Sequence, residues 1–206
     1  MASSLTGLIK KLEWTDFGTP RKSTPPAPGA TATAAFTKAE PSFSGVNFNA
    51  VPGSKPAEFK LADTVAVSVI LHSSRFVNSW VFTHMNKKFQ DDLLHHEQGH
   101  YDIGALLARD FFVDLMLLKG KTYSSLAAAK ADFDAIKKDS IDKQKAVEDL
   151  YDLETSRGKL SGPQKTWDGF IQSAFTTPRS SGTTDQSGKP HKMKLVRALR
   201  NAGKTI

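Results

Sequence analysis

Residues 93–120 read LLHHEQGHYDIGALLARDFFVDLMLLKG, and this stretch decides the fold. Its apolar side chains recur every three or four residues, which places them on one face of an α-helix. The pattern begins near Lys88 and ends at Gly120, a residue type that stops helices. His96 and His100 occupy positions of the apolar stripe that would otherwise hold leucine. The sequence therefore predicts a long helix whose buried face carries two histidines.

The pair His96 and His100 has the spacing of a metal-binding helix. Residues four apart lie about 40° apart around a helix and one turn along it, so both rings can reach one ion. Glu97 lies beside the pair, in position to take the proton of a metal-bound water rather than to bind the metal. Buried imidazoles need a partner, and zinc is the usual metal for imidazole plus carboxylate ligands. We therefore expect one Zn²⁺ per chain; the alternative is a pair of core histidines with ordinary hydrogen bonds.

A catalytic zinc needs a third protein ligand, and helix lengths indicate where to look for it. His96 precedes Gly120 by 24 residues, or about 36 Å of helix at 1.5 Å per residue. Ser124 or Ser125 can cap a second long helix, and an antiparallel return brings residues 146–150 opposite His96. The carboxylates near that level are Glu148, Asp149 and Asp152. Spacing alone leaves all three open as ligands, and a solvated acidic helix face is the alternative.

The rest of the chain predicts short strands before the long helix and further helices after it. The clearest strand is Val65–Leu71, and Asn78–Thr83 is a second short one. Two earlier patches, 31–37 and 43–48, have a β-like composition. Later helices are expected at Pro163–Phe175 and, with basic character, at Met193–Asn201, with the Ser/Gly/Thr-rich linker 179–188 between them. These elements predict an α+β fold of residues 1–178, followed by a flexible basic C-terminal tail, residues 179–206.

The net charge of +7 is concentrated in this tail. Six cations follow Asp185 with no acidic residue among them: Lys189, Lys192, Lys194, Arg197, Arg200 and Lys204. The remaining chain is close to neutral, so a nucleic-acid-binding surface on the folded domain is not expected. The tail is a candidate to contact an anionic polymer or another partner, and a disordered solubilising tail is the alternative.

Two absences in the sequence also limit the classes of function. The chain contains no cysteine, so zinc must be held by His, Asp or Glu. No apolar run is long enough to span a membrane, and residues 1–11 lack the apolar run of a signal peptide.

Four motifs resemble a bacterial domain-of-unknown-function family that is described as predicted secreted zinc-dependent proteases. The matching stretches are HEQGHYDI at His96–Ile103, WTDF at Trp14–Phe17, YDLETSRG at Tyr151–Gly158 and QKTW at Gln164–Trp167. They follow the family's order across roughly residues 12 to 175. The resemblance implies a zincin-like metallopeptidase domain at 1–178, a secreted or exported protein, and a peptide or protein substrate.

The resemblance also implies roles for individual residues. It favours Asp152 as the third zinc ligand, with His96 and His100, while Glu97 activates the water for hydrolysis of a peptide bond by an endopeptidase. Tyr151, Arg157 or Tyr101 would then help to stabilise the oxyanion. The chain departs from the family at Arg157, where the pattern has histidine. This departure motivates the alternative function, a non-catalytic metal-binding protein or pseudoenzyme that acts through interactions.

Several other residues near the motif receive minor roles. Asp102 is expected to be structural or to support a ligand, and His95 to face solvent or to support one. The strand Val65–Leu71 is a candidate for binding substrate as an added strand, with an ordinary core strand as the alternative. The histidines without partner spacing are interpreted as ordinary; they are His72, His84 and His191.

Overall fold

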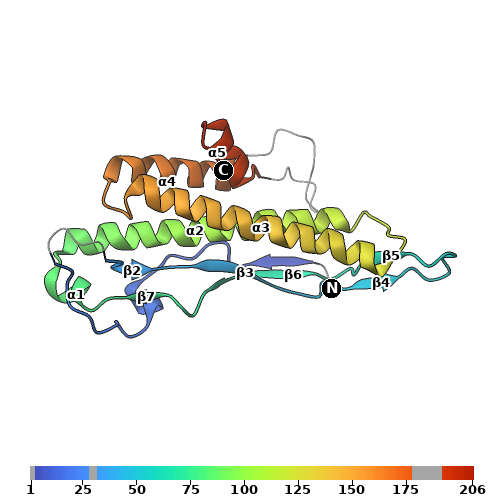
Figure 1. Ribbon diagram of the computed structural model, residues 1–206, viewed down its shortest axis with the longest axis horizontal. Helices are drawn as coiled ribbons and strands as arrows, with labels where there is room; N and C mark the ends of the chain where they lie inside the picture. Colours follow the sequence, from blue (N-terminus) through green and yellow to red (C-terminus); the bar gives the residue numbers. More distant parts are fainter. Residues whose placement is uncertain (1–2, 28–31, 178–191) are drawn as a thin grey trace.

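Helix α2 (Lys87–Leu118) is the central element, with the strands on one side of it and α4 and α5 on the other (Figure 1). The computed structural model describes residues 3–27, 32–177 and 192–206. Side chains of α2 belong to all three hydrophobic clusters of the core. The protein has the expected α+β fold, and its predicted long helix is buried around most of its circumference.

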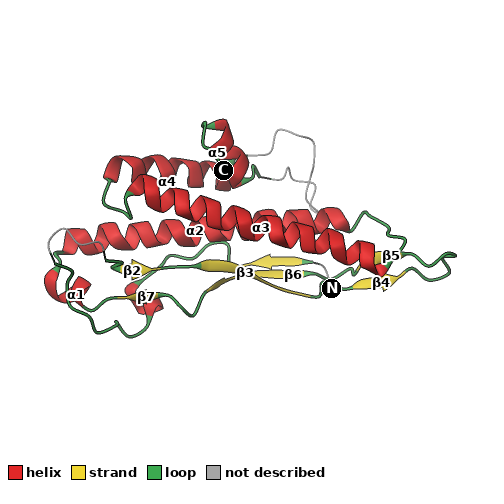
Figure 2. Ribbon diagram, in the orientation of Figure 1, coloured by secondary structure: helices red, strands yellow, loops and turns green. Residues whose placement is uncertain are grey.

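The strands form three small sheets along α2 (Figure 2). The largest has the order β1-β6-β3, with β1 parallel and β3 antiparallel to β6; its strands are Ser4–Thr6, Ala66–Leu71 and Ala39–Ser44. Two antiparallel pairs complete the layer, namely β2 (Ala35–Phe36) with β7 (Phe76–Val77), and β4 (Phe48–Ala50) with β5 (Phe59–Leu61). The strand predicted at 65–71 is the middle strand β6, which pairs with β3 along its whole length and with β1 over 66–68. This pairing favours the alternative of a core strand, because only the β1-side edge beyond Ser68 has no partner strand among the described residues.

The strand predicted at Asn78–Thr83 was wrong. β7 ends at Val77, and a short helix, α1 (Trp80–His84), follows. Consecutive residues Trp80 and Val81 are both buried, which a strand with alternating faces does not allow. A second short helical segment, η1 (Trp14–Phe17), contains the WTDF motif and buries Phe17.

Helix α3 (Leu126–Thr155) runs back antiparallel to α2, as the sequence predicts (Figure 1). Its N-cap is Ser125, whose hydroxyl accepts a hydrogen bond from the Ala128 N–H at 3.1 Å. Asn86 caps α2 in the same way through the Phe89 N–H. Both caps satisfy backbone donors that a helix leaves free at its start, so they fix where the two helices begin.

The C-terminal segment is not the flexible tail that its charge suggests. After α4 (Ser161–Thr176), residues 192–206 include the helix α5 (Leu195–Asn201), which packs on α2 and α4. Leu195 and Leu199 are fully buried in the cluster that α2, α3 and α4 share. Apolar residues four apart anchor this helix, and its cations point to the rim. The linker 179–188, Lys189 and His191 lie outside the described residues.

Acidic partners on the domain neutralise some of the charge of this segment. Lys194 pairs with Asp114 at 2.5 Å, and Lys204 pairs with Glu154 at 2.7 Å. Within the described ranges no helix is long and apolar enough to cross a membrane.

Candidate metal centre

His96, His100 and Asp152 meet between α2 and α3. The Nε2 atoms of the two histidines lie 3.1 and 3.0 Å from the same oxygen, Oδ1 of Asp152. The ligand atoms of the three residues all lie within 4.8 Å of one another, and both imidazoles are buried. Helix geometry predicted a ligand near residues 146–150, and Asp152 lies just beyond that range. The structure thus brings together the three residues expected to bind metal.

The hydrogen-bond partners of His96 fit a bound cation. Its Nδ1 faces Oε1 of Gln164 at 3.3 Å, and its Nε2 faces the carboxylate of Asp152. The Gln164 amide is oriented by its own donation to Asp168. A neutral imidazole has one N–H, so two facing acceptors leave one nitrogen mismatched. A divalent cation held by Nε2 and Oδ1 removes the mismatch, while Nδ1–H donates to Gln164.

The titration properties of the cluster follow from this proximity. Burial alone would raise the pKa of Asp152, but its hydrogen bonds with His100 and His96 lower it well below its usual range. Burial alone would lower the pKa of His100, but the hydrogen bond with Asp152 and the charge of Glu97 raise it overall. The carboxylate is therefore ionised and ready to bind a cation at neutral pH.

Tyr151 packs against both imidazoles, but its hydroxyl turns to the backbone of α2, which corrects its expected role as an oxyanion donor. Its ring stacks on the His96 ring at 4.7 Å, and its hydroxyl donates to the His96 carbonyl oxygen at 3.0 Å. The side chain is fully buried and passes beside Gly99, where an added Cβ would lie 2.1 Å from the hydroxyl oxygen. The glycine inside the motif is needed because Tyr151 occupies the space of its side chain.

Three residues that the sequence analysis gave no role complete the surroundings of His96. Gln164 faces its Nδ1, and the Thr155 hydroxyl lies 3.5 Å from the same atom. Trp167 packs edge-on against Tyr151 and donates to Glu154. All three belong to the motifs of the family resemblance. The motifs therefore contained these residues, but no spacing rule predicted which atoms they contact.

The turn between α3 and α4 covers His96 and carries Arg157. Ser156, Arg157 and Gly158 all have positive φ, and an added Cβ at Gly158 would lie 2.7 Å from the His96 Cβ. The turn can approach the imidazole this closely because residue 158 has no side chain. Arg157 is exposed and lines the cleft beside the cluster.

Glu97 is the most unusual ionisable group in the protein. Its side chain is 2% exposed, and Oε2 has no hydrogen-bond partner. Burial raises its pKa, while the nearby imidazoles of His100 and His96 oppose the increase. A buried carboxylate with a raised pKa and an unpaired oxygen, next to a candidate metal site, has the properties of a general base.

The other candidate carboxylates have different partners. Glu148 accepts a hydrogen bond from Gln144 at 2.8 Å, and burial raises its pKa. Asp149 is exposed and pairs with Lys145. Neither belongs to the group of three potential ligands, so among the described residues the geometry favours Asp152.

The remaining residues of the HEQGHYDI motif hold the helix in place. Gln98 accepts from the Leu12 N–H at 2.7 Å and donates to Asp102 at 2.9 Å. The Tyr101 hydroxyl donates to the Gly7 carbonyl oxygen and its ring is buried, so its expected oxyanion role is wrong. His95 is exposed and contacts Asp168 at 3.0 Å. The contact with Gln98 gives Asp102 the structural role that was expected. His95 is connected to Gln164 because both side chains contact the carboxylate of Asp168.

An open cleft of about 1070 Å³ lies over the cluster. Its floor is the face of α2 with His96, Glu97 and His100, and its walls are residues 32–37 and the end of α3. The three buried polar atoms without a partner in the described chain, on Thr37, Glu97 and His100, all belong to residues that line it. The cluster is thus accessible to a ligand of peptide size.

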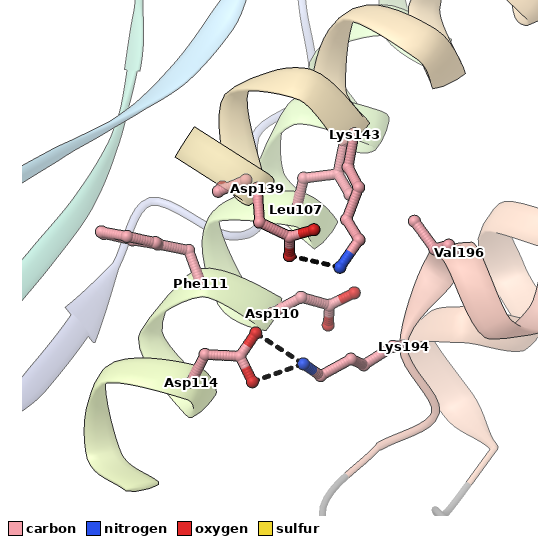
Figure 3. A pocket seen from close by; sticks show the side chains of 9 residues that line it. Leu107, Asp110, Phe111, Asp114, Asp139, Lys143, Lys194 and Val196 are labelled. Carbon is pink, nitrogen blue, oxygen red and sulfur yellow. Dashed lines mark hydrogen bonds and ion pairs between the residues drawn. The ribbon is translucent and has the colours of Figure 1, made fainter. Parts of the chain in front are cut away.

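A second, much smaller cavity lies near Asp110, Asp114 and Lys194 (Figure 3). Its volume of about 20 Å³ has room for little more than a water molecule. Lys194 reaches Asp114 and Lys143 reaches Asp139 across it, so its charges are paired (Figure 3). The ion pairs that line this cavity connect α2, α3 and the C-terminal segment, so we assign them a structural role.

Comparisons of the chain with protein-family models, with curated proteins and with solved structures found no match. The functional interpretation consequently depends on the geometry and chemistry of the cluster.

Proposed function

We propose that the protein is a zinc-dependent metallopeptidase with a zincin-like arrangement, acting as an endopeptidase. The observation that carries the proposal is the convergence of His96, His100 and Asp152 beside the buried, unpaired Glu97 in an open cleft. The HEQGH spacing and the motif resemblance support it.

The protein residues divide the work of peptide hydrolysis among them. The two Nε2 atoms and the Asp152 carboxylate would hold Zn²⁺, with Gln164 orienting His96. Bound zinc would supply an acidified water and a positive charge for the developing oxyanion. Glu97 takes the proton of the attacking water at its carboxylate and delivers it to the leaving amine. Arg157 lines the same cleft and adds a positive charge to its wall.

Metal analysis and conservative substitutions test this proposal. Purified protein should bind one zinc per chain, and Asp152→Asn should lose it whereas Asp149→Asn should keep it. Glu97→Gln should keep zinc and fold but lower peptide cleavage by about 100-fold or more, because it removes the general base. Asp142→Asn, on the exposed face of α3, is the matched control and should leave zinc and turnover unchanged.

The possible failures have different meanings. Unchanged turnover in Glu97→Gln would contradict the mechanism. Stoichiometric zinc without cleavage of any peptide would favour the non-catalytic, metal-binding alternative. Protein that binds no zinc at all would contradict the metal centre.

A further inference from the structure

The cleft is not uniform along the direction of α2. Because α3 is antiparallel to α2, residues before Asp152 lie towards the His100 end and residues after it towards the His96 end (Figure 1). Glu148 and Asp149 line the first end, and Arg157 and Lys159 line the second. The cleft therefore has an acidic end and a basic end; Asp92 also lines the basic end, but its charge is paired with Lys88.

The basic end also carries the apolar lining. Phe89 and Leu93 precede His96 on α2, Phe36 comes from β2, and Leu153 comes from α3. Leu153 is 76% exposed although it is a large apolar side chain. Phe36 lies on the opposite face of its strand from the buried Ala35 and Thr37 and stacks on Phe76, so the apolar lining of this end comes from α2 and α3. A guest side chain against Phe89, Leu93 and Leu153 would remove apolar surface from water on both helices.

The apolar section is close to the general base. Leu93 lies one helical turn, about 5.4 Å, before Glu97. An extended peptide advances about 3.3 Å per residue, so a side chain over Leu93 belongs to a residue one or two positions from the bond above Glu97. This section is thus positioned to select the residue next to the cleaved bond.

The charges at the two ends differ in how they are satisfied. Asp149 is paired with Lys145, and Glu148 accepts from Gln144. Arg157 and Lys159 form no ion pair with any described residue. A negative group on the ligand is therefore the better complement for the basic end than a positive group is for the acidic end.

We propose that the cleft selects peptides with a large apolar residue next to the cleaved bond and an acidic residue beyond it. The apolar side chain lies against Phe89, Leu93 and Leu153, and the acidic group faces Arg157 and Lys159. This inference rests on the proposed peptidase function, which it makes more specific by naming the substrate class.

Peptide binding to zinc-loaded Glu97→Gln tests the inference without turnover. Four fluorescein-labelled decapeptides combine a central Phe or Ala with a following Glu or Lys, and anisotropy gives their dissociation constants. The Phe–Glu peptide should bind most tightly, and replacing Phe by Ala should weaken binding by about 10-fold or more. Replacing Glu by Lys should weaken it further.

Second substitutions in the same protein locate the selectivity. Leu153→Ser and Phe89→Ser should each reduce the preference for Phe, whereas Ile141→Ser, which is exposed on α3 but outside the cleft lining, should not. Arg157→Glu should reverse the preference between Glu and Lys. Lys165→Glu changes the net charge equally on the exposed face of α4 and should leave the preference intact.

The failure of this inference differs from the failure of the proposed function. If the wild-type protein cleaves all four peptides alike and the variant binds them alike, the substrate class is wrong while the peptidase function stands. If the wild-type protein cleaves none but the variant binds the Phe–Glu peptide selectively, the peptidase function is wrong and the ligand class stands. A Phe preference that survives both serine substitutions would contradict the assigned location.

Discussion

Helix α2 buries charged groups in two regions, and the two differ in how those groups are satisfied. Near its middle, Arg109 donates to Asp110 at 2.7 Å and to the carbonyl oxygens of Ala174 and Met193 at 2.8 Å. Asp110 in turn accepts the Leu195 N–H at 3.0 Å. Near the start of the helix, Glu97 and His100 each retain a buried polar atom without a partner.

The contrast separates a structural role from a functional one. Arg109 and Asp110 use their hydrogen-bonding capacity to attach the C-terminal segment to α2 and α4. Around Glu97, buried polar atoms have no hydrogen-bond partner in the described protein, and these atoms belong to residues that line the cleft. Unsatisfied buried polar groups cost stability, so their presence beside a cleft indicates a bound partner or a reaction.

Breaking the satisfied region should have the largest effect on stability. Arg109→Met leaves Asp110 buried without its counter-charge, and the free energy of unfolding should fall by about 3–5 kcal/mol. Residues 192–206 should become sensitive to limited proteolysis. Denaturant unfolding measures the first effect, and Lys138→Met, which removes only an exposed ion pair, is the control with little change. Stability equal to wild type would contradict the structural role.

Removing the support of the metal region should weaken metal binding while leaving the fold intact. Gln164→Leu deprives the Nδ1–H of His96 of its acceptor, and zinc affinity should fall by about 10–100-fold. Competition with a chromophoric chelator measures this change. Gln172→Leu places the same substitution on the exposed face of α4 and should bind zinc as the wild type does. Equal losses in both variants would show that the effect is not specific to His96.

Neutralising Glu97 should stabilise the metal-free protein although it removes the proposed general base. The raised pKa means that folding disfavours the ionised carboxylate, so Glu97→Gln should raise the free energy of unfolding by about 1 kcal/mol at pH 8. The gain should disappear below the unfolded pKa of 4.5, where the carboxyl group is protonated in both states. Denaturant unfolding at both pH values tests this; a loss of stability at pH 8 would contradict the assignment of Glu97 as unsatisfied.

The smallest predicted effect is the pH dependence of zinc binding. The raised pKa of His100 stabilises the metal-free fold below pH 6.5, and this contribution is lost as the pH rises through the folded pKa. Zinc binds only the deprotonated imidazole, so its affinity should fall as the pH is lowered from 8 to 6, because His100 then becomes protonated. Calorimetry in buffers of different ionisation enthalpy should detect the released proton. A zinc affinity that does not change over this pH range would contradict the raised pKa of His100.

Periodicity and capping predicted the helices because α2 and α3 obey local rules. The apolar stripe of α2 and the cap at Ser125 depend on residues within a few positions of each other. The approximate position of Asp152, the candidate ligand, could also be predicted. Two antiparallel helices of similar length, connected by a short loop, fix which residues of one helix face which residues of the other. Its choice over Glu148 and Asp149 came from the motif resemblance rather than from spacing.

The failures involve contacts between residues far apart in the chain. Nothing local indicates that Gln164 faces His96 from a third helix, or that the Tyr151 hydroxyl turns towards the backbone of α2. The C-terminal segment was interpreted from its cations, although Leu195 and Leu199 had the spacing of a buried helical face. The strand expected at 78–83 was wrong because Trp80 and Val81 are anchored by a core that local propensity does not describe.

The contact between Gly99 and Tyr151 has a consequence for protein design. Any side chain at position 99 would push α3 away from α2 and would move Asp152 from the two imidazoles, although it would leave both histidines in place. The interhelical distance of the centre is therefore encoded inside the HExxH motif itself, in its fourth letter. A designer who transfers this centre to another antiparallel helix pair should copy the glycine and the facing tyrosine together with the ligands.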